Sequence, residues 1–503
     1  MLPRRASSGR QRSTTTARRA ETVRYRRPPI YADLSAARYA AVMHGEFRSR
    51  GLLDRLICFL GRASRRAIRP VRSGHMADTG VEAAPVGAPP IGPTKGSEHR
   101  RLKVLRVINS LGTRFGGPSV SCVGAAIGEK RAGADTTLVF ADSGDRANSS
   151  APARRRLAAE EIPFIEFPLV PFVEPLLARL LGRDSSRWGV SLGLSWWLLR
   201  NHRKFDVIHV HGVWGLGATT VLALKRFAPW ELVVTPHESL TRFDVETSST
   251  AVTRVAKTLL RGLIARWTDL VVFSSELELV DSAMRSSVDQ VVVPHAVVDE
   301  RKLTLPSEPR TSVGMTFGFL GRFHPKKNLG LVIEALPQLP SHVTLVIAGG
   351  GSDEAERGVC RLIESSGVNE RVELRGFLDA EQKNLFFREI DLLVMPSEYE
   401  CFGMVAAEAL AAGVPVVATP RVGLAPLVDL TGAGAVVRAS SLDLVGALRL
   451  FVDDEQVRLD WTHSALRGAA HELTFGKYGH AILEAYRRNG DERLPAQARV
   501  PIG

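Results

Sequence analysis

A short basic stretch of the chain has the composition of an anion-binding loop. It reads GRFHPKKN over residues 321–328 and lies between an expected strand and an expected helix. Arg322 and Lys327 are five positions apart, so they can converge on one anion, the arginine as a planar fork and the lysine as a point charge. A solvated basic loop is the alternative, and Lys326 fits that alternative better because Lys327 lies next to the helix start.

Two carboxylates follow a later expected strand, in the segment PSEYECFGMVAAEA at residues 396–409. Glu400 lies in the loop after the strand and Glu408 two turns into the next helix, so both could face one ligand. Carboxylates accept hydrogen bonds from vicinal hydroxyls, which suits a sugar and a ribose. Glu408 stands among alanines on an apolar helix, where a buried carboxylate needs a polar partner. A solvent-facing glutamate is the alternative.

Two loops in the first half of the chain could complete a ligand site. Gly116 and Gly117, in FGGPS at residues 115–119, lie between the first expected strand and helix. Glycines let the backbone approach a ligand, and the helix start offers N–H groups to a phosphate, although a purely structural turn would look the same. His237 ends TPH at residues 235–237, and its place at the carboxyl end of a strand favours a functional over a structural role.

The elements that must position these residues alternate between strand and helix. From residue 101 onward, β-branched runs such as VIHVH, ELVVTPH and LVVFSS are separated by helical stretches, and after about residue 305 the pattern restarts with MTFGFLG and VTLVIAGG. Such alternation indicates right-handed βαβ units and parallel sheets. The sequence therefore predicts an α/β protein with two doubly wound, Rossmann-like domains facing across a cleft. Ligands would bind at the carboxyl ends of the strands.

Composition divides the chain into four ranges. Residues 1–100 are a basic extension and linker that we expect to be disordered, and 101–305 are the N-terminal Rossmann-like domain on the acceptor side. Residues 306–475 are the C-terminal Rossmann-like domain on the donor side, and 476–503 are a C-terminal helix and tail. The final helical stretch is expected to pack back across the first domain.

The net charge of +13 is confined to the N-terminus. Residues 1–76 hold 18 arginines, no lysine and four acidic residues, a net charge of +14, so the remaining 427 residues carry −1. The globular part is thus close to neutral, and the charge gives no reason to expect nucleic-acid binding.

The compartment is predicted to be the cytoplasm. Four cysteines are scattered without metal-ligand spacing or obvious pairing, and neither a run of about 18 apolar residues nor a secretory signal is found. Residues 47–72 could form a basic amphipathic helix on the inner face of the plasma membrane. A non-native extension before Met76 and a targeting segment are the alternatives. A basic helix around residues 254–266 could likewise face an anionic membrane, with an ordinary solvated face as its alternative.

Taken together, these motifs resemble glycosyltransferase family 4, whose fold is called GT-B. The resemblance covers roughly residues 101–485 and is carried by HVHGVWG at 209–215, TPH at 235–237, the GR…K block at 321–327 and PSEYECFGMVAAEALAAGVPVVAT at 396–419.

The resemblance implies a role for each matching residue. Arg322 and Lys327 would hold the diphosphate of a nucleotide-sugar, and His237 would lie at the transferring sugar. Glu400 would bind sugar hydroxyls and Glu408 the ribose. The catalytic residues are then His237, Arg322, Lys327 and Glu400. The donor-binding residues are Gly116, Gly117, Arg322, Lys327, Arg375, Gly376, Phe377, Glu400, Phe402, Gly403, Met404, Val405 and Glu408, with Arg375, Gly376 and Phe377 as the wall for the base.

Two departures from the family pattern stand out. The family usually has Pro-Asn-Gly-Val-Asp where this chain has Pro-His-Ala-Val-Val-Asp at residues 294–299, and because Ala296 cannot cheaply take a positive φ, the turn must differ. Glu238 replaces the usual glycine after His237. The extra carboxylate could repel a donor phosphate or contact the acceptor.

The implied activity is retaining transfer of a sugar from a nucleoside-diphosphate donor to a glycan, lipid-linked or small-molecule acceptor, in polysaccharide or glycolipid biosynthesis. No Asp-x-Asp motif occurs, so cationic side chains and helix N-termini should replace a metal, and no cofactor is expected. Another nucleotide-sugar enzyme, such as an epimerase, and a non-catalytic nucleotide-sugar binding protein are the alternatives.

Overall fold

The computed structural model describes residues 100–142, 149–170, 173, 189–247, 251–282, 284, 288–302 and 314–491. The predictions made for residues 1–99, including the amphipathic segment 47–72, lie outside the described residues.

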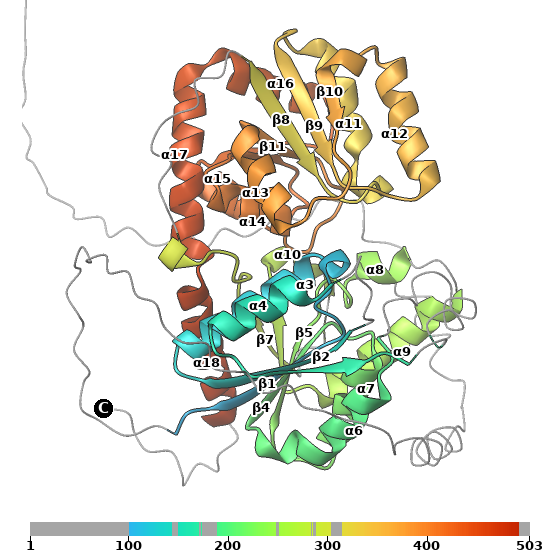
Figure 1. The fold of residues 1–503 in the computed structure, drawn as a ribbon, viewed down its shortest axis with the longest axis vertical. Helices are drawn as coiled ribbons and strands as arrows, with labels where there is room; N and C mark the ends of the chain where they lie inside the picture. Colours follow the sequence, from blue (N-terminus) through green and yellow to red (C-terminus); the bar gives the residue numbers. More distant parts are fainter. Residues whose placement is uncertain are drawn as a thin grey trace, which may run out of the picture. The chain divides into compact units, whose positions relative to one another are not determined.

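The first part of the described chain forms a sheet of seven parallel strands (Figure 1). Its spatial order is β3-β2-β1-β4-β5-β6-β7, so the chain reverses direction across the sheet between β1 and β4. The strands are β1 (Lys103–Ile108), β2 (Asp135–Asp142), β3 (Phe164–Pro168), β4 (Val207–His211), β5 (Glu231–Thr235), β6 (Leu270–Phe273) and β7 (Asp289–Val292).

Helices cover both faces of this sheet. Val104 and Ile108 of β1 pack in the same core cluster as α3, whereas Leu105 and Val107 pack on the opposite face with α6 and α7. Because both faces are buried, the strands are apolar along almost their whole length. The helices are α3 (Gly117–Arg131), α4 (Ala151–Ala159), α6 (Leu192–Asn201), α7 (Leu216–Lys225), α8 (Arg242–Glu246), α9 (Ala251–Trp267) and α10 (Glu276–Ser282).

The second part forms a sheet of six parallel strands in the order β10-β9-β8-β11-β12-β13. Its strands are β8 (Met315–Leu320), β9 (Val343–Ala348), β10 (Val372–Leu374), β11 (Leu392–Met395), β12 (Val416–Ala418) and β13 (Gly434–Val436). Its helices are α11 (Leu329–Ala335), α12 (Asp353–Ser365), α13 (Ala380–Glu389), α14 (Met404–Ala411), α15 (Ala425–Thr431), α16 (Ser441–Asp453) and α17 (Glu455–Glu472). The predicted α/β class with two Rossmann-like sheets is confirmed.

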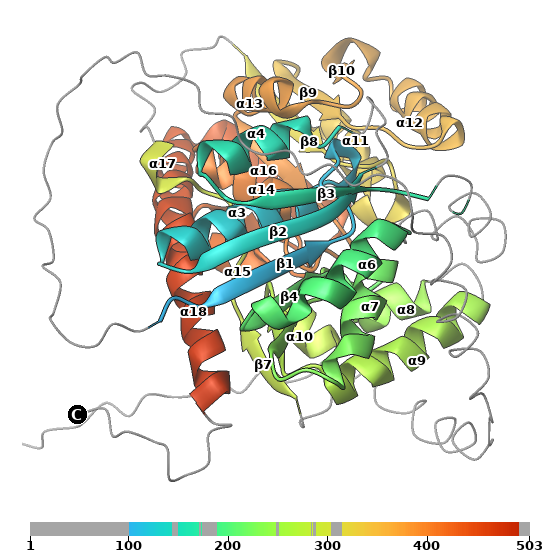
Figure 2. The ribbon, with the colours of Figure 1, turned by 60° about the horizontal axis from the view of Figure 1, so that its bottom comes forward.

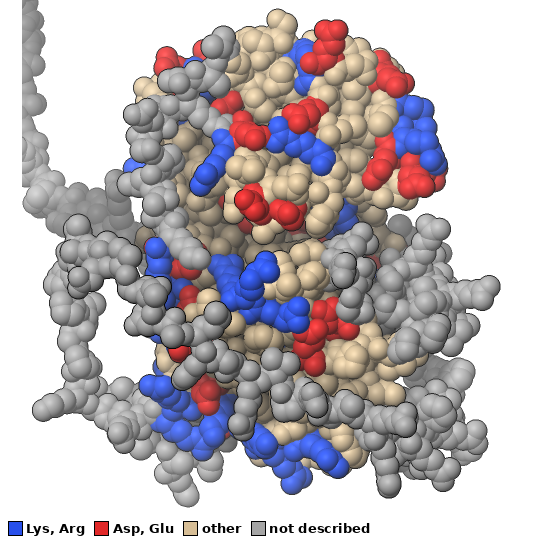
Figure 3. All heavy atoms as spheres, viewed as in Figure 1, with Lys and Arg blue, Asp and Glu red and all other residues tan. Residues whose placement is uncertain are grey.

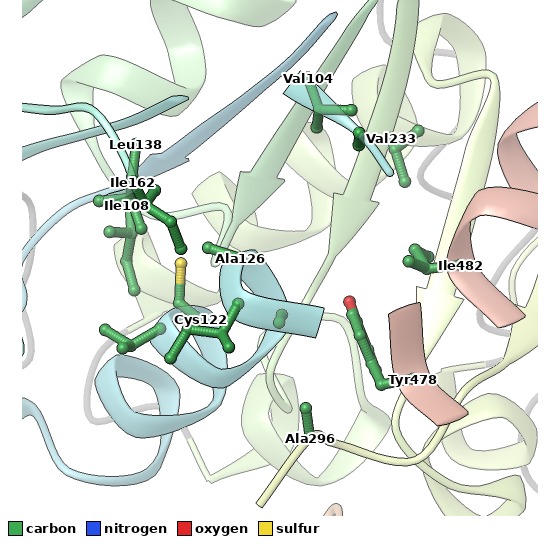
Figure 4. Close-up of a cluster of buried hydrophobic side chains, with 14 of the residues drawn as sticks. Val104, Ile108, Cys122, Ala126, Leu138, Ile162, Val233, Ala296, Tyr478 and Ile482 are labelled. Atoms are coloured by element: carbon green, nitrogen blue, oxygen red, sulfur yellow. The ribbon is translucent and has the colours of Figure 1, made fainter. Parts of the chain in front are cut away.

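The last helix, α18 (Phe475–Asp491), returns to the first sheet and lies against α3 (Figure 2). Tyr478 and Ile482 enter the core cluster of that sheet, beside Cys122 and Ala126 of α3 (Figure 4). The two helix backbones touch, because a Cβ atom at Gly479 would lie 2.0 Å from the carbonyl oxygen of Gly128. The C-terminal helix is therefore part of the hydrophobic core of the first half.

Charges of both signs are interspersed over the described surface seen in Figure 3, in keeping with the near-neutral sum outside residues 1–76. Within the described ranges, none of the helices has both the length and the apolar character needed to cross a bilayer.

Candidate active site

His237 lies in a strained turn just after β5. Its φ is +50° and that of Glu238 is +74°, a left-handed conformation that non-glycine residues adopt at a cost of about 1–3 kcal/mol each. The fully buried carboxylate of Glu278 holds the turn, since it accepts hydrogen bonds from the Glu238 amide at 2.7 Å and the Ser274 amide at 2.9 Å. Strain kept in place by a buried acceptor fixes the direction of the His237 ring.

Four histidine rings meet at this edge of the first sheet. His209 and His211 of β4 stack with centroids 4.7 Å apart, His211 lies 5.2 Å from His237, and His237 lies 5.0 Å from His295. His211 Nδ1 and His237 Nε2 are hydrogen-bonded at 2.9 Å. Burial, with the nearby cation of Arg106, lowers the pKa of every one of these rings, and that of His295 to about 3. The cluster is therefore uncharged near neutral pH.

The basic loop of the second half presents two lysines, and each pairs with a carboxylate. Lys327 Nζ lies 2.5 Å from Glu400 Oε1, and their side chains are only 13% and 14% exposed. Lys326 Nζ lies 2.8 Å from Glu238 Oε1, and its side chain is 12% exposed. Burial alone would lower the pKa of Lys326, but Glu238 and Glu400 outweigh it and raise that pKa.

The prediction that Lys326 belongs to a solvated basic loop is wrong. Its partner, Glu238, belongs to the strained turn of the first half, which no local pattern around Lys326 could reveal. The pair also gives the carboxylate of Glu238 a role that the sequence did not suggest: it joins the two halves. Arg322 is exposed at the edge of the same loop, whereas the stem of Lys327 passes back over Gly321, whose missing Cβ would lie 3.6 Å from Lys327 Cε.

Two helix N-termini meet beside these lysines. Helix α3 begins after Gly116 (φ +69°) and α14 after Gly403 (φ +98°), and neither start is capped by a side chain. A Cβ atom at Gly117 would lie 2.9 Å from Met404 Cγ, so the first turns of the two helices are in contact. Uncapped N–H groups at two adjoining helix starts form a positive end suited to an anion.

Residues of the predicted ribose and base sites lie on the second sheet. Glu408 of α14 pairs with Lys383 at 2.6 Å, so it has the polar partner that its apolar helix required and does not simply face solvent. Arg375 is held by Glu373 at 2.7 Å and also by Glu389. Phe377 is 59% exposed, which leaves its ring open to stacking.

The remaining predicted donor-site positions lie in or next to two loops of the second half, one before α14 and one after β10. Phe402 is buried against His295, with ring centroids 4.9 Å apart, and so connects the histidine cluster to the α14 start. Gly376 takes a positive φ of +62°, and its carbonyl accepts a hydrogen bond from the Gly349 amide at 2.6 Å. Val405 lies in the first turn of α14. Ala296 has no positive φ, as its residue type required.

The chain is similar in sequence to known sugar transferases. The family described as "Glycosyl transferase 4-like domain" matches residues 116–295, and "Glycosyl transferases group 1" matches residues 308–467. The D-inositol 3-phosphate glycosyltransferase of Mycolicibacterium smegmatis is 30% identical over 309 residues, 56% of this chain and 67% of that relative. The chain belongs to glycosyltransferase family 4. A relative of the same description from Xylanimonas cellulosilytica is 28% identical over 323 residues, 59% of this glycosyltransferase and 75% of the relative.

Solved structures confirm the GT-B fold of this glycosyltransferase. Sucrose-phosphate synthase from Thermosynechococcus elongatus superposes with a TM-score of 0.61 at 18% identity, covering 78% of this chain and all of that one. The Anabaena protein HepE, solved in complex with UDP-glucose, superposes with a TM-score of 0.60 at 20% identity, covering 77% and 100%. The predicted family, fold and class of enzyme are thus confirmed.

Sequence reasoning missed the buried polar groups behind His237. Arg106 and His209 interrupt apolar strand runs, KVLRVI and VIHVH, and Glu129 lies within a helix whose other residues are mostly apolar or small. A charge within a strand expected to be buried is itself the signal, because it demands a buried partner.

Proposed function

We propose that this glycosyltransferase moves a sugar from a nucleoside-diphosphate donor to an acceptor hydroxyl with retention of anomeric configuration and without a metal ion. One observation carries the proposal: positive groups and a carboxylate gather at the loops that follow the strands. These groups are the Lys327–Glu400 ion pair and the uncapped N-termini of α3 and α14, together with the neutral ring of His237. The positive groups suit a diphosphate, and the carboxylate suits sugar hydroxyls.

The chemistry follows from where charge develops. As the bond between the anomeric carbon and the phosphate oxygen breaks, its electron pair goes to the diphosphate, beside Lys327 and the helix starts. Fixed positive groups that strengthen their interaction with the growing charge lower the barrier. The acceptor oxygen then bonds to the anomeric carbon on the same face and passes its proton to the leaving phosphate. Glu400 holds hydroxyls of the transferring sugar throughout.

Names of similar proteins guide the choice of first substrates. HepE was solved with UDP-glucose, so UDP-sugars are the first donors to test, followed by GDP- and ADP-sugars. The relatives named D-inositol 3-phosphate glycosyltransferase make a small polyol phosphate the first acceptor to test, before glycans and lipid-linked acceptors.

The decisive experiment separates transfer from its alternatives. Purified protein is incubated with each donor, with and without acceptor, in EDTA, and diphosphate release and donor identity are followed. A transferase releases diphosphate in step with glycosylated acceptor. Conversion of the donor to an epimer without acceptor would favour the epimerase. A thermal shift with donor but no turnover, either in EDTA or after Mg²⁺ or Mn²⁺ is supplied in excess, would favour the non-catalytic binding protein.

A cytoplasmic enzyme that touches the inner face of the membrane is our further proposal, and helix α9 supports it. Lys257, expected on a basic face, is instead buried and pairs with Asp244 at 2.8 Å. The outward face of α9 carries an apolar stripe of three exposed side chains, each one helical turn from the next: Val255, Leu259 and Leu263. Sedimentation with anionic vesicles tests the contact. A triple serine variant of the stripe should lose vesicle binding, and unchanged binding would contradict the proposal.

A further inference from the structure

A fully buried ion pair contacts the histidine cluster through His211. Arg106 of β1 and Glu129 of α3 are both 0% exposed, with Nε to Oε2 at 2.8 Å and Nη2 to Oε1 at 2.7 Å. Arg106 also donates to Tyr478 of α18 at 3.0 Å, and its Nη1 contacts His211 Nε2. Burying two charges costs several kcal/mol per ion, and their attraction often does no more than offset that cost, so a gain in folding stability does not by itself explain the presence of this pair.

The hydrogen-bond pattern fixes which nitrogen carries the proton in each ring. A guanidinium has five N–H donors and no acceptor, so His211 Nε2 must be the acceptor from Arg106. A neutral imidazole then carries its proton on Nδ1, and His211 Nδ1 donates to His237 Nε2 at 2.9 Å. His237 accepts there, so its own proton lies on Nδ1.

We infer that Arg106 acts through His211 as a positioning residue that holds His237 as the Nδ1–H tautomer. The rings stay neutral near pH 7 because burial lowers the pKa of His211 and His237, and the charge of Arg106 lowers both further. The tautomer is therefore set by the hydrogen-bond chain and not by titration.

This assignment deepens the proposed function and rests on it for its meaning. With Nε2 occupied by His211, the nitrogen of His237 left for a ligand is a donor. It can donate to a sugar hydroxyl or a phosphate oxygen of the donor, and it cannot take a proton from the acceptor. A proton acceptor for the attacking hydroxyl must then come from elsewhere, as it does when the leaving phosphate takes it.

A second chain in the same cluster provides a matched control. Tyr486 of α18 donates to Glu129 Oε1 at 2.6 Å, so its oxygen accepts from His209 Nδ1 at 2.6 Å. His209 Nε2 in turn accepts from Thr235 Oγ1 at 2.8 Å. This branch shares Glu129 with the first but leads to His209 and not to His237. Tyr486→Phe therefore perturbs the same buried cluster without breaking the line from Arg106 to His237.

The test reads the tautomers directly and needs no substrate. The full-length protein is labelled with ¹⁵N-histidine, and long-range ¹H–¹⁵N spectra, assigned with His211→Gln and His237→Gln, distinguish Nδ1–H from Nε2–H rings. We expect both rings to be Nδ1–H in the wild type. Arg106→Met with Glu129→Met removes both charges together and should mix the tautomers of both rings, whereas Tyr486→Phe should change only His209.

The outcomes separate this inference from the proposed function. An Nε2–H signal for His237 in the wild type overturns the inference, as does an unchanged His237 signal in the double variant. Should the double variant fail to fold, the wild-type spectrum still decides whether His237 carries its proton on Nδ1 or on Nε2. If the tautomers are as inferred, the folded double variant should lower kcat about tenfold, the loss expected for one hydrogen bond. If both rings are Nδ1–H but the protein transfers no sugar, the proposed function is contradicted and the tautomer inference is not.

Discussion

Lys327→Met removes the cation that lies closest to Glu400 and is predicted to slow the chemical step. In the structure Lys327 pairs with a carboxylate that is 14% exposed. In the proposed mechanism it also supplies positive charge for the departing diphosphate. The single variant loses both. Lys327→Met combined with Glu400→Gln leaves no unpaired carboxylate, so it isolates the second contribution.

The magnitude follows from the place of this lysine. Removing one preorganised partner of a charge that grows in the transition state typically costs about 10²–10³ in rate. We therefore expect the single variant to lose about that factor in kcat. Glu400→Gln alone should also lower kcat, because Glu400 would contact the reacting sugar. The double variant should regain none of the activity lost in the single variants.

The neighbouring pair is the matched comparison. Lys326→Met with Glu238→Gln removes an ion pair of similar burial that joins the two halves. It should lower the free energy of unfolding and raise KM more than it lowers kcat. Steady-state kinetics and urea unfolding of all variants decide the matter. Recovery of kcat when Glu400→Gln is added to Lys327→Met would contradict a role for Lys327 in the chemical step, since Lys327 would then only neutralise Glu400.

Three further outcomes are expected. Glu408→Gln should raise the KM for donor and leave kcat unchanged in steady-state kinetics, because ribose hydroxyls do not change charge during transfer. A lower kcat with an unchanged KM would mean that Glu408, and not Glu400, contacts the reacting sugar. The free energy of unfolding should fall as the pH drops below about 6.5, by up to about 1.4 kcal/mol per pH unit for each neutral buried histidine, because the unfolded chain then binds protons that the folded cluster does not. Urea unfolding at a series of pH values should show a shallower fall for His295→Phe than for the wild type, and a flat profile in the wild type would contradict the neutrality of the cluster. Gly479→Ala should destabilise the folded protein by about 1–3 kcal/mol, because the new Cβ would meet the Gly128 carbonyl oxygen at 2.0 Å. Gly446→Ala, in open space within α16, should instead stabilise it slightly. Equal effects of the two variants in thermal unfolding would argue against close contact of α3 and α18.

The sequence was sufficient for features that depend on local pattern. The alternation of strands and helices predicted both parallel sheets, which the structure confirms. Polar residues such as His237 and Lys327 lie just after strands, as the sequence pattern indicated. Their role in binding a ligand stays a prediction. Contacts between segments that are distant in the sequence could not be predicted from local pattern. Lys326 was misjudged because Glu238 is 88 positions away, and the partners of Arg106 lie in α3, β4 and α18. Pairings of this kind depend on the packing of whole elements, which no window of sequence contains.

The central claim is tested most directly by the stereochemistry of the product made in EDTA. A UDP-sugar and a polyol phosphate acceptor are incubated with the enzyme and an excess of chelator, and the anomeric configuration of the product is read by ¹H NMR. Retaining, metal-independent transfer predicts turnover in chelator with the same anomeric configuration in product and donor. An inverted product, or no turnover until Mg²⁺ or Mn²⁺ is added, would contradict it.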